Sequence, residues 1–251
     1  MTKTVIYDFG SNNGDDIPYY LLKADLVVAV EANPVLANNI RERFKAEIAA
    51  NRVVVESCVL TVGDAAPNVP FYIHKRLHVG SQFPRPSAER LVDFEQVTLP
   101  AKKALDIVHA YGEPHYIKID IEHYDHVILH DLLANRIKPP YISAESHSIK
   151  CFCHLVAAGY GAFKLVNGPS VHIKYANHEI ATAAGKQRYI FPAHAAGPFG
   201  NDIRGPWMTD DNLFHVLGYA GLGWKDVHAS RADAPDPSYR PQPKFTLTMD
   251  Y

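Results

Sequence analysis

Short apolar runs alternate with segments of helical periodicity through the first two thirds of the chain. The apolar runs predict strands at residues 4–9, 25–31, 52–60, 115–122, 141–145 and 162–166. The segments between them predict helices at residues 15–24, 33–51, 101–112, 124–133 and 148–160. Strands that alternate with helices in this way are typical of a mostly parallel sheet with helices on both faces. The sequence therefore predicts an α/β fold.

Two segments interrupt this alternation. Residues 61–76 combine turn residues with a short period-2 run, which predicts a small hairpin at the rim of the sheet. From about residue 167 the pattern becomes irregular and rich in Gly, Pro, His and Ala, although its aromatic residues argue for order. Residues 244–251 alternate apolar and polar positions and predict an edge or antiparallel strand. We expect one domain over residues 1–251, with a core at 1–166 and a long irregular extension at 167–251.

Length and composition narrow the functional classes. At 251 residues and 47% hydrophobic content, the chain can bury a substantial core. A net charge of -2 offers no basic field for a phosphate backbone, which disfavours nucleic acid as a partner. The start of the sequence has no signal-peptide pattern, and no apolar run reaches the roughly 20 residues that a membrane helix needs. With only three cysteines, Cys58, Cys151 and Cys153, these features predict a cytoplasmic protein without a membrane partner.

A turn with two glycines follows the first predicted strand, in the stretch IYDFGSNNGDD at residues 6–16. In an open parallel sheet, ligands bind beyond the carboxyl ends of the strands, and glycine leaves room for a ligand to approach the backbone. Gly10 and Gly14 fit this role, and the alternative is a tight turn that binds nothing. Asn12 replaces the middle glycine of the dinucleotide motif G-x-G-x-x-G, which disfavours the pyrophosphate of NAD.

The pattern that remains, D-x-G-x-x-x-G, is typical of a site for S-adenosylmethionine. Asp8 is a candidate partner for the ammonium group of this cofactor, and the backbone of residues 10–14 offers N–H donors for its carboxylate. Glu31 ends the second predicted strand about 20 residues later, where a carboxylate can accept hydrogen bonds from both ribose hydroxyls. Position alone places Ser57 and Cys58 near the adenine. The predicted cofactor contacts are Asp8, Gly10, Ser11, Asn12, Gly14, Glu31, Ala32, Ser57, Cys58 and Asp120.

The sequence resembles the FkbM-like class I methyltransferases in an ordered set of segments. DFGSNNG, VEANP, IKIDIEHYDHVILHDL and YISAE are similar to the family's glycine motif, its E-P-N-P-like segment, its K-I-D-x-E-G-x-E-x-x-x-L segment and its strand ending in glutamate. The resemblance covers residues 4–166 and implies a Rossmann-like sheet, S-adenosylmethionine as cofactor and methyl transfer as activity. It also implies that Ser81 and Gln82 lie near the cofactor, where the family carries a serine-rich segment. The family usually has Gly and Glu where this chain has His123 and Asp125.

Polar clusters at the ends of the fourth and fifth predicted strands are candidates for catalysis. Methyl transfer requires an acceptor atom behind the sulfonium carbon and usually a base that removes its proton. The segments DIEHYD and AESH bring carboxylates and a histidine to one rim of the sheet. The candidate catalytic residues are Asp120, Glu122, Glu145 and His147.

The same strand ends allow two other interpretations. Asp120 and Glu145 occupy positions comparable to the magnesium ligands of catechol-type methyltransferases, and oxygen ligands suit such a hard cation. Alternatively, these acids cap the helices that follow, an interpretation that applies above all to Glu122. Lys118 lies within the fourth predicted strand, either as an ion-pair partner in the cleft or with its amino group at the rim.

The sequence thus predicts a methyltransferase that uses S-adenosylmethionine and acts on a small molecule, with an oxygen of a sugar or secondary metabolite as the expected acceptor. Residues 167–251 are expected to cover the acceptor site. An NAD-dependent oxidoreductase and a non-catalytic nucleoside-binding module are the alternatives. The sequence predicts no oligomeric state.

Overall fold

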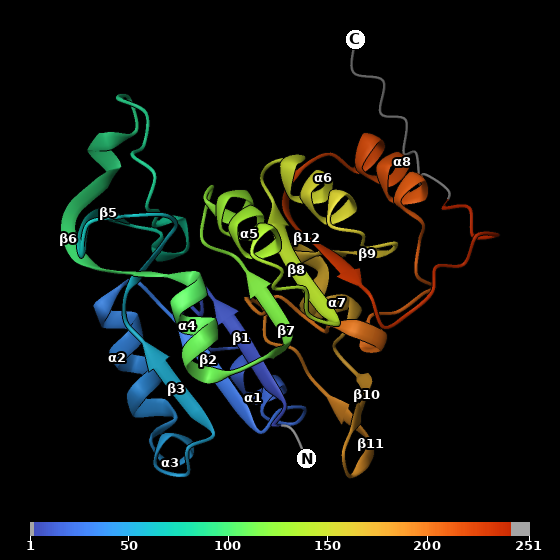
Figure 1. Ribbon diagram of the computed structural model, residues 1–251. Helices are drawn as coiled ribbons and strands as arrows, with labels where there is room; N and C mark the ends of the chain where they lie inside the picture. The colour runs from blue at the N-terminus through green and yellow to red at the C-terminus, as the bar shows by residue number, and fades with distance from the viewer. Residues whose placement is uncertain (1–2, 242–251) are drawn as a thin grey trace.

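The computed structural model describes residues 3–241 and has a seven-stranded central sheet (Figure 1). Its strands are β1 (Val5–Phe9), β2 (Leu26–Val30), β3 (Val53–Glu56), β7 (Pro114–Ile119), β8 (Tyr141–Ser146), β9 (Ala162–Asn167) and β12 (Gly223–Ser230). Their order is β3-β2-β1-β7-β8-β12-β9, with β12 antiparallel to both of its neighbours and the other pairs parallel. This is a Rossmann-like order with one added antiparallel strand, so the predicted α/β fold is confirmed.

Helices cover both faces of this sheet. They are α1 (Ile17–Tyr20), α2 (Pro34–Arg43), α3 (Lys45–Ala49), α4 (Ala104–Tyr111), α5 (Asp125–Ala134), α6 (Lys150–Ala157), α7 (Val171–Lys174) and α8 (Asp210–Ala220). Helices α4, α5, α6 and α8 pack on the face that carries Tyr7, Ile117 and Ile142. Helices α1 and α2 pack on the opposite face with Ile6 and Tyr116. Among the helices of residues 3–241, none is both long and apolar enough to cross a membrane.

Local sequence signals set the ends of α2. Asn33 caps this helix, because its side chain accepts a hydrogen bond from the backbone N–H of Val35, and Pro34 occupies the first turn. The helix predicted over residues 33–51 is divided at Phe44, where the backbone leaves helical dihedral angles and the ring packs in the core. The predicted helix is therefore two helices, α2 and α3.

A second, three-stranded sheet contains β5 and β6, which stand apart from the central sheet at the upper left of Figure 1. Its strands are β4 (Val59–Thr61), β5 (Asn68–His74) and β6 (Phe94–Lys103). The strand predicted at residues 52–60 is therefore two strands in different sheets. The hairpin predicted within residues 61–76 is not formed there, because β5 pairs with β6, which begins only at Phe94. The sequence did not indicate β6, because only Phe94 and Leu99 of its ten side chains are buried.

The segment after residue 167 contributes a strand to the central sheet. β12 lies between β8 and β9 and pairs with both. The sequence predicted irregular structure here, because Asp226 and His228 give this strand a polar pattern although both side chains are buried. The core sheet therefore extends beyond the predicted boundary at residue 166.

The same segment also covers one face of the sheet. Phe199 stacks on Tyr116 of β7, with ring centroids 4.1 Å apart, and Phe191 belongs to the same hydrophobic cluster. The strands β10 (His178–Thr182) and β11 (Gly185–Tyr189) form an antiparallel hairpin next to this hydrophobic cluster. The strand predicted at residues 244–251 lies outside the described residues.

Candidate ligand-binding and catalytic site

The first βα turn lies where the strand order of the sheet reverses, between β1 and β7. Gly10 has a φ of 86°, a left-handed conformation that glycine adopts without strain. A Cβ atom at this position would lie 1.7 Å from the carbonyl oxygen of Asp120, just after β7. Gly14 has a φ of 78° and lies against the side chains of Ile17 and Ile40. Packing thus requires glycine at position 10, the left-handed backbone favours it at position 14, and Gly10 also lines a cavity.

This cavity has a volume of about 370 Å³. Gly10 and Glu31 follow β1 and β2, whereas Glu122, Glu145 and His147 come from the ends of β7 and β8, so the strand order separates the two groups and we call them the two ends of the cavity. Its apolar wall includes Leu60, Phe71 and Phe83. A single cavity therefore connects the predicted cofactor end with the predicted catalytic end.

Glu31 presents a buried carboxylate to this cavity. Its Oε2 accepts a hydrogen bond from the backbone N–H of Asn12 at 2.8 Å, and its Oε1 accepts one from that of Asn33 at 2.7 Å. Burial raises the pKa of Glu31 to about 7, although these two hydrogen bonds lower it. Because a carboxylate has about four acceptor positions, one on each oxygen remains for a ligand. Two adjacent hydroxyls, such as those of a ribose, match this arrangement.

Asn12 occupies the position that the dinucleotide motif gives to its middle glycine. Its φ is 48°, a left-handed conformation that asparagine tolerates better than most residues. Its side chain lies on the cavity wall, and its Oδ1 has no hydrogen-bond partner among residues 3–241. This position therefore offers an unpaired acceptor rather than the empty space that a pyrophosphate needs.

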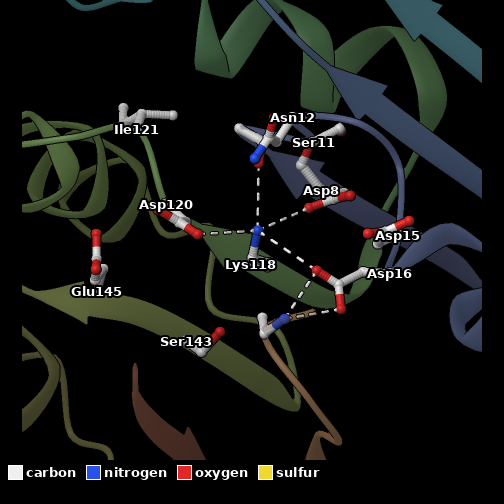
Figure 2. A network of polar contacts seen from close by, with 12 residues as sticks. Asp8, Ser11, Asn12, Asp15, Asp16, Lys118, Asp120, Ile121, Ser143 and Glu145 are labelled. Atoms are coloured by element: carbon white, nitrogen blue, oxygen red, sulfur yellow. Dashed lines mark hydrogen bonds and ion pairs between the residues drawn. The ribbon is translucent and has the colours of Figure 1, made fainter. Parts of the chain in front are cut away.

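Lys118 lies at the centre of a buried group of carboxylates (Figure 2). Its Nζ is 3.4 Å from Oδ1 of Asp8, 3.3 Å from Oδ2 of Asp120 and 3.8 Å from Oδ2 of Asp16. Burial lowers the pKa of Lys118, but the three carboxylates together raise it well above its usual value. Lys118 therefore stays charged and acts as the ion-pair partner that the sequence offered as one of two roles.

Asp8 belongs to this group and not to the cavity wall. The sequence assigned it to the cofactor, but its side chain is fully buried. Asp8 and Lys118 are register partners on β1 and β7, so their side chains point to the same face of the sheet. Asp8 thus holds the two central strands together beneath the glycine turn.

Glu122, Glu145 and His147 meet at the other end of the cavity. Nε2 of His147 lies 2.8 Å from Oε2 of Glu145 and 3.3 Å from Oε2 of Glu122. The contacts with Glu122 and Glu145 raise the pKa of His147 to about 10. Burial, followed by the nearby charge of Asp120, raises the pKa of Glu145. His147 is therefore the cation of this group at neutral pH, and Glu145, whose pKa is raised to about 9, keeps its proton there unless a bound cation displaces it.

The cavity wall contains most of the predicted site residues. Those on the wall are Gly10, Asn12, Glu31, Ala32, Cys58, Ser81, Asp120, Glu122, Glu145 and His147. Those away from it are Asp8, Ser11, Gly14, Ser57 and Gln82. Ser11 donates a hydrogen bond to the carbonyl oxygen of Asp8, and Gln82 donates one to that of Pro84. These two side chains therefore support loops in the structure.

Several wall residues were not predicted from the sequence. His78 and Val79 come from the loop after β5, and His194 and Trp224 come from the segment after residue 167. They are far apart along the chain, and no motif connects them. Within residues 167–241, only His194 and Trp224 line the cavity, so the predicted cover over the acceptor site depends on these two side chains.

Two buried acids near the catalytic end were also missed. Oδ1 of Asp125 accepts a hydrogen bond from the backbone N–H of Ile121 at 3.0 Å, and burial raises its pKa to about 7. Asp226 of β12 lies directly opposite Glu145 of β8. A buried acid in a polar stretch has no sequence signal of its own, because its burial depends on strands that pair across the fold.

Comparison with solved structures finds proteins of similar fold at low sequence identity. Methyltransferase FkbM from Methylobacillus flagellatus is 14% identical, with 62% of this chain and 36% of that chain covered and a TM-score of 0.39. The precorrin-6y C5,15-methyltransferase from Geobacter metallireducens is 15% identical, with 74% and 73% covered and a TM-score of 0.36. An S-adenosylmethionine-dependent methyltransferase from Aquifex aeolicus is 14% identical, with 65% and 76% covered and a TM-score of 0.33. No protein-family model and no curated protein sequence matches the chain.

Proposed function

We propose that the chain is an S-adenosylmethionine-dependent methyltransferase that methylates a hydroxyl group of a small molecule, such as a sugar or a secondary metabolite. The observation that supports this most is the single cavity between Glu31 at the end of β2 and the acid and histidine cluster at the end of β8. The first end fits the ribose of a nucleoside. The second end fits an acceptor whose proton must be removed.

The charge of the cavity wall favours a cationic cofactor over NAD. Within the part of the chain that the structure describes, the wall carries neither Lys nor Arg. Its carboxylates are Glu31, Asp120, Glu122 and Glu145. S-adenosylmethionine carries a sulfonium and an ammonium group, which such a wall attracts. The pyrophosphate of NAD is anionic and would meet repulsion, because the cationic His147 on this wall already contacts Glu122 and Glu145.

The wall residues fit the parts of this cofactor. Glu31 would accept hydrogen bonds from the ribose hydroxyls, and the unpaired Oδ1 of Asn12 offers a further acceptor nearby. Asp120, whose side chain is 31% exposed, takes the ammonium role that the sequence gave to Asp8. Cys58 and Leu36 line an apolar part of the wall that suits the adenine.

The protein residues have two tasks in the transfer. When bound, the cofactor supplies an electrophilic methyl group on sulfur, and the acceptor oxygen displaces a neutral thioether. Glu122, and Glu145 once it is ionised, line the acceptor end of the cavity and would take the proton from that oxygen. His147 contacts both carboxylates and holds them in place. The apolar wall, with Phe71 and Phe83, would exclude water from the acceptor.

Calorimetry with S-adenosylhomocysteine and with NADH tests this proposal. We expect S-adenosylhomocysteine to bind and NADH not to bind. Transfer of a labelled methyl group to a panel of hydroxyl-bearing acceptors then tests the activity. Binding of NADH without S-adenosylhomocysteine would contradict the proposal and favour an oxidoreductase.

A further inference from the structure

We propose that Glu122, Glu145 and His147 form a binding site for a divalent transition-metal ion at the catalytic end of the cavity. All three residues line the cavity, so an ion held by them would have open positions toward a ligand. The inference goes beyond the proposed function, because the ion would bind these residues whether or not S-adenosylmethionine binds.

The spacing of the ligand atoms fits a shared ion. One ligand atom from each of the three residues lies within 4.8 Å of the others. Nε2 of His147 is 2.8 Å from Oε2 of Glu145 and 3.3 Å from Oε2 of Glu122. Metal–ligand bonds of about 2.1 Å place neighbouring ligands of one ion about 3 Å apart. The observed separations therefore match neighbouring ligands of a single ion.

The contact between Nε2 of His147 and Oε2 of Glu145 is an ion pair that does not have hydrogen-bond geometry. Across the described chain, residues 3–241, neither Nε2 of His147 nor Oε2 of Glu145 makes a hydrogen bond, although the two atoms are 2.8 Å apart. The ring N–H therefore does not point at the carboxylate oxygen. The side chain of Glu145 is only 5% exposed, so water cannot readily satisfy it. An ion between the three side chains would displace the proton of His147 and bind Nε2 of His147 and Oε2 of Glu145 directly.

Further acids increase the negative charge around this position. Asp120 and Asp125 also bring ligand atoms within 4.8 Å of Glu145. Figure 2 shows that Lys118 balances the charge of Asp120. Glu145 lies beside Asp120 in this view and contacts none of the residues drawn. Oδ2 of the buried Asp125 has no hydrogen-bond partner within residues 3–241. We assign the ion to Glu122, Glu145 and His147 rather than to Asp120, Asp125 and Glu145. In the described chain, no Lys or Arg forms an ion pair with any of the first three residues.

The ligand set indicates the class of ion. Imidazole nitrogen suits zinc, iron, cobalt and nickel, and carboxylate oxygen also suits manganese, whereas magnesium prefers oxygen alone. One histidine with two carboxylates therefore favours Mn²⁺, Fe²⁺, Co²⁺ or Zn²⁺ over Mg²⁺. An acceptor hydroxyl bound to such an ion would lose its proton more readily.

The test uses the full chain after EDTA treatment, with Mn²⁺, Zn²⁺ and Mg²⁺ as probes. We expect calorimetry to show that one Mn²⁺ or Zn²⁺ binds per chain and that Mg²⁺ binds with at least tenfold lower affinity. Glu122→Gln, Glu145→Gln and His147→Gln should each weaken Mn²⁺ binding at least tenfold. The matched controls His109→Gln and Glu113→Gln change exposed residues of the same types and should leave binding unchanged. Circular dichroism checks the fold, and Glu122 and His147, at 22% and 23% exposure, are less buried than Glu145 at 5%.

Pulsed electron paramagnetic resonance separates a histidine site from an acidic surface. Bound Mn²⁺ should show nitrogen hyperfine coupling that His147→Gln removes. The inference is overturned by the absence of saturable Mn²⁺ and Zn²⁺ binding, by equal Mg²⁺ affinity, or by nitrogen coupling that survives in His147→Gln. Binding of S-adenosylhomocysteine, measured on the same samples, tests the proposed function separately. Metal binding without S-adenosylhomocysteine binding would reject that function and leave this inference standing.

Discussion

The carbonyl oxygen of Asp120 lies against the backbone of Gly10, so close that a Cβ atom on residue 10 would be 1.7 Å away. The backbone N–H of Asp120 donates a hydrogen bond to the carbonyl oxygen of Phe9 at 2.9 Å. On the other side, the N–H groups of Gly10 and Ser11 donate to the carbonyl oxygen of Val30. The glycine turn is thus tied to both neighbouring strands, β7 and β2, and the cavity is built around it.

Replacing Gly10 by alanine should destabilise the protein strongly. We expect Gly10→Ala to cost about 3 kcal/mol or more, because left-handed backbone strain and a clash with Asp120 act together. Gly63→Ala is the matched control, because Gly63 has a φ of 59° but a Cβ atom there would meet nothing within 4 Å. It should cost about 1–2 kcal/mol, the strain alone. Urea denaturation measures both, and equal losses would show that the contact with Asp120 carries no penalty.

Removing the carboxylate of Glu31 should weaken cofactor binding. We expect Glu31→Ala to lose about 1.5–3 kcal/mol of affinity for S-adenosylhomocysteine, roughly 10- to 100-fold, because a charged acceptor for the ribose is lost. Glu56→Ala is the matched control, since Glu56 ends the adjacent strand β3 but pairs with Lys102 and is not on the cavity wall. Calorimetry measures both variants. Unchanged affinity in a folded Glu31→Ala protein would reject the ribose assignment.

The fold and the position of Glu31 beside the first turn could be predicted because their signals are local, and the role of Glu31 toward a ligand stays a prediction. Alternating strands and helices give the sheet, and a carboxylate at the end of the second strand of such a sheet lies beside the first turn. The position of the glycine turn was also predicted correctly. The sequence explained Gly10 by the room that a ligand needs, whereas the structure shows a neighbouring strand at that place. The nearest neighbour of Gly10 is the backbone of Asp120, and which strand lies beside β1 depends on pairing across more than 100 residues.

The features that the sequence did not predict depend on distant contacts. Asp8 faces Lys118, so the pairing of β1 with β7 decides that it is buried in an ion group and not exposed to a ligand. β12 has a polar pattern because Asp226 and His228 are buried between β8 and β9, where an apolar pattern would be expected. Trp224 lies on the cavity wall because β12, which carries it, is inserted between β8 and β9.

Neutralising Asp226 should change how stability depends on pH. Burial, followed by the charge of Asp120, raises the pKa of Asp226 well above its usual value, while Lys118 lowers it. A carboxyl group with a raised pKa in the folded state stabilises the fold at low pH. It loses that contribution as the pH rises from its unfolded pKa of 3.8 toward its folded pKa. Asp226→Asn cannot ionise, so it should gain stability relative to the wild type as the pH rises.

We expect this gain to reach up to about 1.4 kcal/mol for each pH unit above 3.8, over the range in which the folded protein still holds the proton. Urea denaturation at several pH values measures the difference between Asp226→Asn and the wild type. Asp64→Asn is the control, because Asp64 is fully exposed and its ion pair with Lys103 lies at the surface. Its difference from the wild type should be small at every pH tested. A constant difference for Asp226→Asn would show that Asp226 titrates normally.

Shortening Trp224 should affect the acceptor and not the cofactor. Trp224 lies at the start of β12, next to the position that pairs with Ser146, and so beside the catalytic end of the cavity. Its ring also packs over Gly168, where a Cβ atom would meet it at 2.2 Å, although the residue is 43% exposed. We expect Trp224→Ala to lower kcat/KM for the acceptor about tenfold, the loss of about 1.4 kcal/mol of apolar contact, with unchanged S-adenosylhomocysteine affinity.

Phe214→Ala is the matched control for this variant, since Phe214 is an exposed aromatic residue of α8 that does not line the cavity. Both its acceptor kinetics and its S-adenosylhomocysteine affinity should match the wild type. Deleting residues 191–225 would be a poorer test, because it removes Phe199 from the face of the sheet and the first residues of β12. Shortening the side chain of Trp224 alone tests the contact with the acceptor and leaves the packing of this segment on the sheet in place. If Trp224→Ala weakens S-adenosylhomocysteine binding as much as acceptor turnover, Trp224 covers the cofactor and the acceptor lies elsewhere along the wall.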